Sequence, residues 1–84
     1  MTKVTITVER PTNGFANLHG AIKGIPFGLC TSADAIPAGD NFQIILSGRK
    51  RNDTYTAANS FIEMFDGTII SAMEKTGKNE VSLL

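Results

Sequence analysis

The sequence predicts one small domain, residues 1–84, that is mostly β: a small barrel or a rolled antiparallel sheet, OB-like if closed, with at most one short helix near residues 53–65. Short alternations of apolar and polar residues are separated by turn residues at regular intervals, which is typical of such sheets. Hydrophobic residues make up 42% of the chain and charged residues 19%, as in globular proteins. A length of 84 residues is near the lower limit for a domain that folds unaided.

The first strand has the clearest pattern. Val4, Ile6 and Val8 alternate with polar residues, and both the period of two and the β-branched side chains favour a half-buried strand. The stretch 11–14, which contains an Asn-Gly pair, predicts the turn that ends it.

Three weaker segments follow. Residues 15–22 are a second strand candidate, interrupted by a glycine. The alternation of Ile25, Phe27 and Leu29, with Pro, Gly and Cys on the opposite face, predicts another strand. Residues 33–41 contain Pro and Gly and are expected to form a loop.

Two further strands are expected in the second half of the chain. The apolar run 42–46 predicts a core strand. Near the end of the chain, a turn over 75–79 leads into the alternating residues 80–84, which predict a closing strand.

The segment from Asn52 to Asp66 allows two interpretations. As a helix, it would have Asp53 as its N-cap and Gly67 as its C′ residue. Its apolar stripe would then be Tyr55, Ala58, Phe61, Ile62 and Phe65. As strands, residues 61–65 would pair with 68–73 across an Asp66-Gly67 turn. We favour the hairpin, because several residues of the segment are middling helix formers.

Composition excludes several classes of protein. Eight basic and eight acidic residues cancel, so no overall field attracts the chain to nucleic acid or anionic lipid. One cysteine, Cys30, cannot form an intramolecular disulfide. The N-terminus has no signal-peptide pattern, and no apolar stretch approaches the ~20 residues of a membrane helix. We therefore expect a cytoplasmic protein that does not enter membranes.

The residues needed for catalysis are sparse. His19 is the only histidine, and Cys30 lies in an apolar stretch where a thiol acts as a small hydrophobe. No serine has the Gly-x-Ser-x-Gly context of a nucleophile elbow. Asp34 and Asp40 lack the spacing of a calcium loop, and they suit turn hydrogen bonds better. We expect no enzyme, no cofactor and no metal site.

A binding function is favoured instead. Arg49, Lys50 and Arg51 form the only cluster of like charge, and the strand before them places them at the expected tip of a β-hairpin. Tyr55 follows closely, and Phe27 is a second aromatic candidate. Cations that contact phosphates beside rings that stack bases are typical of proteins that bind single-stranded nucleic acid.

Three short segments resemble the small single-stranded-DNA-binding proteins of filamentous phages. They are residues 3–6, residues 24–27 (Gly-Ile-Pro-Phe) and residues 36–39 (Ile-Pro-Ala-Gly). The resemblance implies an OB-like barrel that binds DNA through Phe27, Arg49, Lys50, Arg51 and Tyr55. This chain departs from the family in the short interval between Phe27 and Pro37 and in its fewer aromatic residues, so no family is assigned.

The alternative function is protein binding, as an inhibitor or assembly subunit of phage or plasmid type. An exposed strand edge or an apolar patch would then hold the partner. The apolar C-terminal residues 81–84 suit that role. A domain this small can also complete its core by self-association, so a homodimer is expected under either function.

Overall fold

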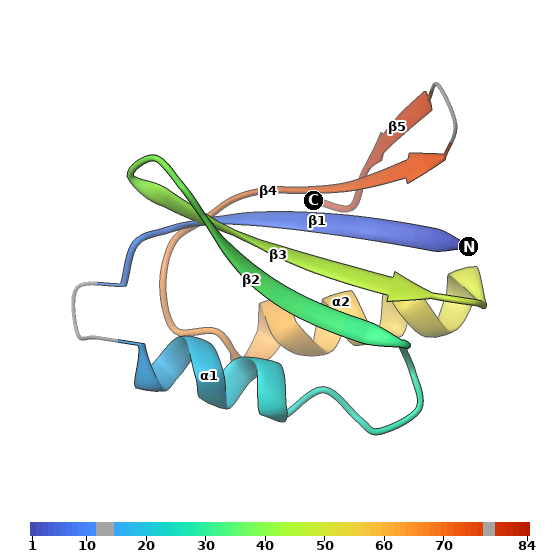
Figure 1. Cartoon of the computed structure of the whole chain (residues 1–84), viewed down its shortest axis with the longest axis horizontal. Coiled ribbons are helices and arrows are strands. Elements are labelled where there is room, and N and C mark those ends of the chain that lie inside the picture. The colour runs from blue at the N-terminus through green and yellow to red at the C-terminus, as the bar shows by residue number, and fades with distance from the viewer. Residues whose placement is uncertain (12–14, 77–78) are drawn as a thin grey trace.

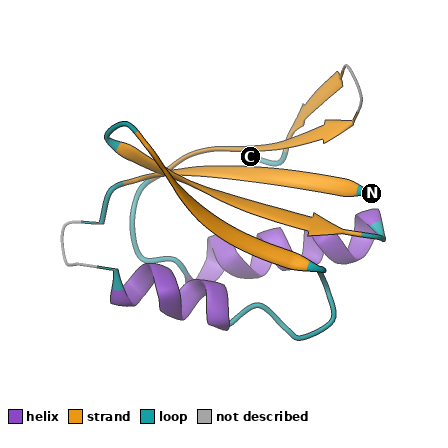
Figure 2. Cartoon of the chain, viewed as in Figure 1, coloured by secondary structure: helices purple, strands orange, loops and turns teal. Residues whose placement is uncertain are grey.

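The computed structural model describes residues 1–11, 15–76 and 79–84, and it contains one antiparallel sheet with two helices on one of its faces (Figures 1 and 2). Five strands lie in the order β2-β3-β1-β4-β5. The elements are β1 (Thr2–Glu9), α1 (Ala16–Lys23), β2 (Ser32–Ala38), β3 (Asn41–Gly48), α2 (Arg51–Met64), β4 (Ile69–Thr76) and β5 (Asn79–Ser82).

The connections follow a simple rule. Helix α1 joins β1 to β2, with β3 lying between these two strands, and α2 joins β3 to β4, with β1 lying between them. This is the split βαβ arrangement, used twice. Both helices cover the same face of the sheet, and they contact each other (Figure 2).

The core lies between the helices and the sheet. Along β1 and β3, alternate side chains face the helices and are buried, whereas those between them are half-buried on the open face. The buried apolar residues are Val4, Ile6, Val8, Leu18, Ala21, Phe42, Ile44, Leu46, Ala57, Ala58, Phe61, Phe65 and Ala72. The sheet face that contacts the helices is therefore buried, and the opposite face is accessible to solvent.

Several predictions from the sequence are confirmed. The chain is mostly β and its strands are antiparallel. The strands expected around residues 4–8, 42–46 and 80–84 are present as β1, β3 and β5. The sheet is not closed into a barrel, because β2 and β5 lie at its two ends, so the OB-like form was wrong. The turns expected over 11–14 and 75–79 include residues 12–14 and 77–78, which lie outside the described residues. Of the second turn, residues 75 and 76 belong to β4 and residue 79 to β5.

The expectation of at most one helix was also wrong. Residues 16–23 form α1 instead of a strand, because Leu18 and Ala21 point into the core at helical spacing. The half-buried Ile22 packs against the same core, next to Ala21 along the helix. This apolar stripe is short, and Gly20 lies on the exposed side of the helix.

Two other predictions from the sequence, a strand followed by a loop, were reversed. Residues 25–29 form a loop rather than a strand, and residues 32–38 form strand β2 rather than a loop. Pro37 is tolerated because β2 is an edge strand. Gly39 has a φ of 64° at the first central position of the β2–β3 turn, as a type II′ hairpin requires.

The preferred hairpin was wrong, and the helical alternative is confirmed as α2, which includes residues 61–64. The second strand of that hairpin, expected over residues 68–73, is nevertheless present as β4. Burial of Thr54, Ala57, Ala58 and Phe61, at spacings of three and four, outweighs the middling helix propensities. Asp53 lies in the first turn of the helix, while Lys50 is the N-cap residue. The Asp66-Gly67 pair belongs to the loop between α2 and β4.

Gly48 provides a test of how closely α2 packs on the end of β3. A Cβ atom at this position would collide with Oγ1 of Thr54. We expect Gly48→Ala to lower the free energy of unfolding by about 1–3 kcal/mol, measured by urea denaturation. Because Thr54→Ala removes that oxygen, the double variant should lose less than the sum of the two single losses. Additive losses would contradict the proposed contact.

Candidate nucleic-acid interface

The connection between β3 and α2 positions the predicted basic cluster. Thr54 lies buried in the first turn of α2, where its Oγ1 donates a hydrogen bond of 2.8 Å to the carbonyl oxygen of Lys50. The backbone N–H of Thr54 donates to the same oxygen at 3.0 Å. Lys50 itself is extended, with φ −110° and ψ 128°. The cluster therefore spans a strand-to-helix junction, and the expectation of a hairpin tip was wrong.

Arg49 and Lys50 line a groove beside this junction. Its other lining residues are Gly28, Leu29, Cys30, Thr31 and Asp53, and its volume is about 350 Å³. We call it the basic groove. Arg49 and Lys50 are both exposed, and neither has an ion-pair partner among the residues that the structure describes. With Asp53 opposing them, the groove carries a local charge of about +1.

The loop before β2 forms the opposite wall of the basic groove. Both the backbone N–H and the Oγ1 of Thr31 donate to the carbonyl oxygen of Ser47, at 2.7 and 2.9 Å, which holds the loop against the end of β3. Gly28, with a φ of 91°, gives the loop its sharp bend. Burial raises the pKa of the Cys30 thiol, so this side chain stays protonated near neutral pH.

Phe27 is fully exposed at this loop, with a relative accessibility of 107%. It lines a second, adjoining groove of about 370 Å³, together with Ile22, Ile25, Pro26, Gly28, Cys30, Thr31, Ser32 and Ala33. We call it the apolar groove. The two grooves share the residues at positions 28, 30 and 31. The ring of Phe27 therefore lies beside a surface that leads directly to Arg49 and Lys50.

Arg51 and Tyr55 have a different role. The Nη2 atom of Arg51 lies 2.9 Å from Oε1 of Glu74, which is 1% exposed on the helix-facing side of β4. Nη2 also donates to the Tyr55 hydroxyl at 3.1 Å, and this hydroxyl in turn donates to Glu74. The hydrogen bonds to Tyr55 and Glu74, and the charge of Glu74, raise the pKa of Arg51. These contacts join the first turns of α2 to β4.

The five predicted site residues thus divide into two groups. The structure brings Arg49, Lys50 and Phe27 to two adjoining grooves. It directs Arg51 and Tyr55 instead to the buried carboxylate of Glu74, which the sequence reasoning missed. The spacing of four residues between Arg51 and Tyr55 was a usable signal, because such pairs are neighbours on a helix.

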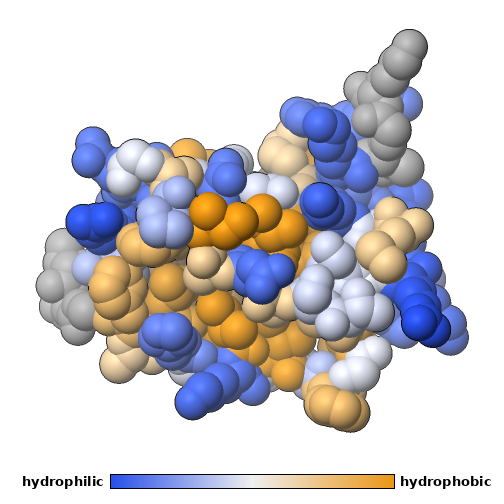
Figure 3. Space-filling view, viewed as in Figure 1, coloured by the Kyte–Doolittle hydropathy of each residue, from blue (hydrophilic) through white to orange (hydrophobic). Residues whose placement is uncertain are grey.

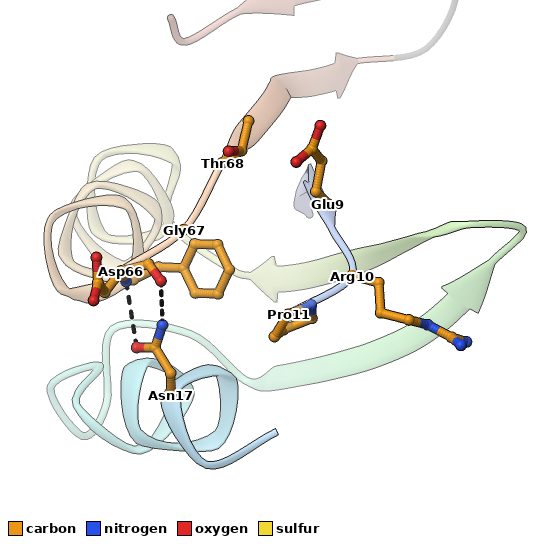
Figure 4. A pocket seen from close by; sticks show the side chains of 8 residues that line it. Glu9, Arg10, Pro11, Asn17, Asp66, Gly67 and Thr68 are labelled. Carbon is orange, nitrogen blue, oxygen red and sulfur yellow. Dashed lines mark hydrogen bonds between the residues drawn. The ribbon is translucent and has the colours of Figure 1, made fainter. Parts of the chain in front are cut away.

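A smaller pocket of about 120 Å³ lies at the opposite end of α2 (Figure 4). Its lining includes Glu9, Arg10, Asn17 and Asp66. The side-chain amide of Asn17 donates to the carbonyl oxygen of Asp66, and its Oδ1 accepts from the N–H of Asp66 at 3.3 Å. These two hydrogen bonds fasten α1 to the loop after α2, so the Asn17 side chain serves to hold the fold together.

Comparisons with models of known protein families, with curated proteins and with solved structures find no match. Within residues 1–11, 15–76 and 79–84, no three His, Cys, Asp or Glu residues are grouped so as to hold a metal ion. In the same part of the chain, no helix is long and apolar enough to cross a membrane.

The different roles of Arg51 and Arg49 can be tested by measuring the stability of variants. Arg51→Met removes a charged partner from the buried Glu74, so we expect it to lower the urea concentration at the unfolding midpoint. Arg49→Met is the matched control, since Arg49 is exposed and makes no ion pair with a described residue. Equal midpoints for the two variants would contradict a structural role for Arg51.

Proposed function

We propose that this chain is a small non-enzymatic binding module that holds single-stranded nucleic acid across the basic groove. Arg49 and Lys50 contact backbone phosphates, and the ring of Phe27 stacks on a base. The observation that supports this most strongly is the fully exposed Phe27 beside a groove with two cations that have no ion-pair partner among the described residues. Nucleic-acid strands are held by this combination of charge and stacking.

The energetics predict weak binding by one copy. Two phosphate contacts on a single strand contribute a slope of about −1.4 to the plot of log affinity against log salt. Stacking on one aromatic ring contributes roughly 1–3 kcal/mol and tolerates any base. Asp53 in the groove opposes phosphate, and Arg51 adds little because Glu74 balances its charge. A module of this kind therefore binds without strong sequence preference.

The start of α2 adds to the attraction for phosphate. The helix begins at Arg51, directly after the two cations, and none of the described side chains forms a capping hydrogen bond at its start. Backbone N–H groups at a helix N-terminus favour a nearby negative charge. The carboxylate of Asp53 uses part of this field, which again keeps the expected affinity low.

The test is fluorescence anisotropy of a labelled single-stranded oligonucleotide at several salt concentrations. We expect Arg49→Gln and Lys50→Gln each to make the salt slope shallower by about 0.7. We expect Phe27→Ala to weaken binding by roughly 5- to 150-fold without changing the slope. Lys75→Gln, on exposed Lys75 of β4, is the control and should leave both quantities unchanged.

The outcomes separate the two candidate functions. Absence of binding at low salt, or equal effects of Lys75→Gln and Arg49→Gln, would overturn the nucleic-acid proposal. The second candidate, an inhibitor or assembly subunit that binds a protein, is favoured by one observation: Phe27 is a bare apolar anchor beside the apolar groove. In that case Phe27→Ala would abolish binding of the protein partner, while Arg49→Gln would not.

A further inference from the structure

We propose that strand β2 pairs with β2 of a second copy of this chain, so that two sheets join across a two-fold axis. This contact uses a different surface from Arg49 and Lys50, and it does not depend on nucleic-acid binding. It also differs from the edge that the sequence suggested, because it places the contact at β2 rather than at residues 81–84. An antiparallel pair of identical edge strands satisfies two-fold symmetry.

Most residues of strand β2 are exposed. It lies at one end of the sheet, and its alternating residues are exposed or half-buried on either side. Ala35, Ile36 and Pro37 are all exposed. Figure 3, viewed as in Figure 1 with β2 in front, shows hydrophobic surface at the middle of this face. The edge thus combines unpaired backbone groups with apolar side chains.

The hairpin fixes which backbone groups of β2 point away from β3. Ala38 lies opposite Asn41 across a two-residue turn, so these two residues form a hydrogen-bonded pair. Because the pattern alternates, the N–H and C=O groups of Ala33 and Ala35 point outward, together with the C=O of Pro37. The N–H of Thr31 is already used, since it donates to Ser47.

Hydrogen bonding leaves two registers for a pair of β2 strands. If Ala35 lies opposite Ala35 of the second copy, four backbone hydrogen bonds form: two between these alanines and two from Ala33 to Pro37 carbonyls. If Ala33 lies opposite Ala35, four bonds also form. Any other register forms fewer bonds within Ser32–Ala38, because Pro37 has no N–H and Thr31, whose N–H already donates to Ser47, lies outside the strand.

Electrostatic repulsion favours one of the two registers. Pairing Ala33 with Ala35 would place Asp34 directly opposite Asp34 of the second copy, and like charges in that position are destabilising. Pairing Ala35 with Ala35 places Asp34 opposite Ile36 instead. The small alanine side chains present no steric obstacle, and β2 carries no lysine of the kind that often protects an edge strand.

The same register covers apolar surface beside the strand. Pro37 of the second copy comes to lie next to Ala33, which lines the apolar groove with Ile22 and Ile25. Symmetry repeats this contact at the other end of the strand pair. The opposite edge of the sheet is less suited to pairing, since β5 has only four residues and includes the charged Glu80.

Ile36 allows a test that is specific to this register. It is 44% exposed on the open face of the sheet, so neither charge variant should disturb the fold. Ile36→Asp places two carboxylates opposite each other twice in the dimer, and we expect it to raise the dissociation constant by about tenfold. Ile36→Lys places an ammonium opposite Asp34, and we expect the dissociation constant to stay equal or fall. Both are measured by sedimentation equilibrium of the full chain.

Val81→Asp on strand β5 is the control, and we expect it to leave the dissociation constant unchanged. A wild-type chain that stays monomeric up to millimolar concentration would overturn the proposal. Equal shifts for Ile36→Asp and Ile36→Lys would overturn the register. A dimer that is lost in Val81→Asp would overturn the assignment to β2. Because the assay contains no nucleic acid, none of these results depends on the proposed function.

Discussion

The side chains of Val4, Ile6 and Val8 lie completely buried on one face of β1, the central strand. Burial of this apolar face determines where the other elements pack. Strands β3 and β4 pair with β1 on either side and extend the same apolar face. Both helices must then lie on that face, because the alternation of β1 leaves only polar or half-buried residues on the other. The layered arrangement follows from this single alternation.

The junction of β3 and α2 turns this packing into a candidate site. Burial of Thr54 beside Gly48 brings the first turn of α2 close to the end of β3. Glu74 holds the same turn from β4 through Arg51. With one cation used in this way, Arg49 and Lys50 remain in solvent and face the loop that carries Phe27. Of the three adjacent cations, Arg51 therefore stabilises the fold, while Arg49 and Lys50 remain available for the proposed binding.

The sequence was informative where one local pattern dominates. The alternation in β1 and the apolar run in β3 predicted their strands. Of the predicted site residues, Arg49, Lys50 and Phe27 line two adjoining grooves, and their role in binding stays a prediction. The sequence was misleading where tertiary contacts decide. Middling helix formers become α2 because its stripe is buried, and Pro37 looked like a loop residue until β2 was found at an edge. Glu74 carries no local signal, since its partners lie about twenty residues earlier.

Nuclear magnetic resonance tests the central claim most directly, because it reports on each backbone amide separately. Amide resonances of the uniformly ¹⁵N-labelled chain would be followed during titration with a short single-stranded oligonucleotide at low salt. The account predicts that shifts concentrate at residues 27–31 and 49–53, around the basic groove. Shifts confined to the open face of the sheet, for example at Thr5, Thr7 and Gln43, would contradict it. So would a spectrum that does not change.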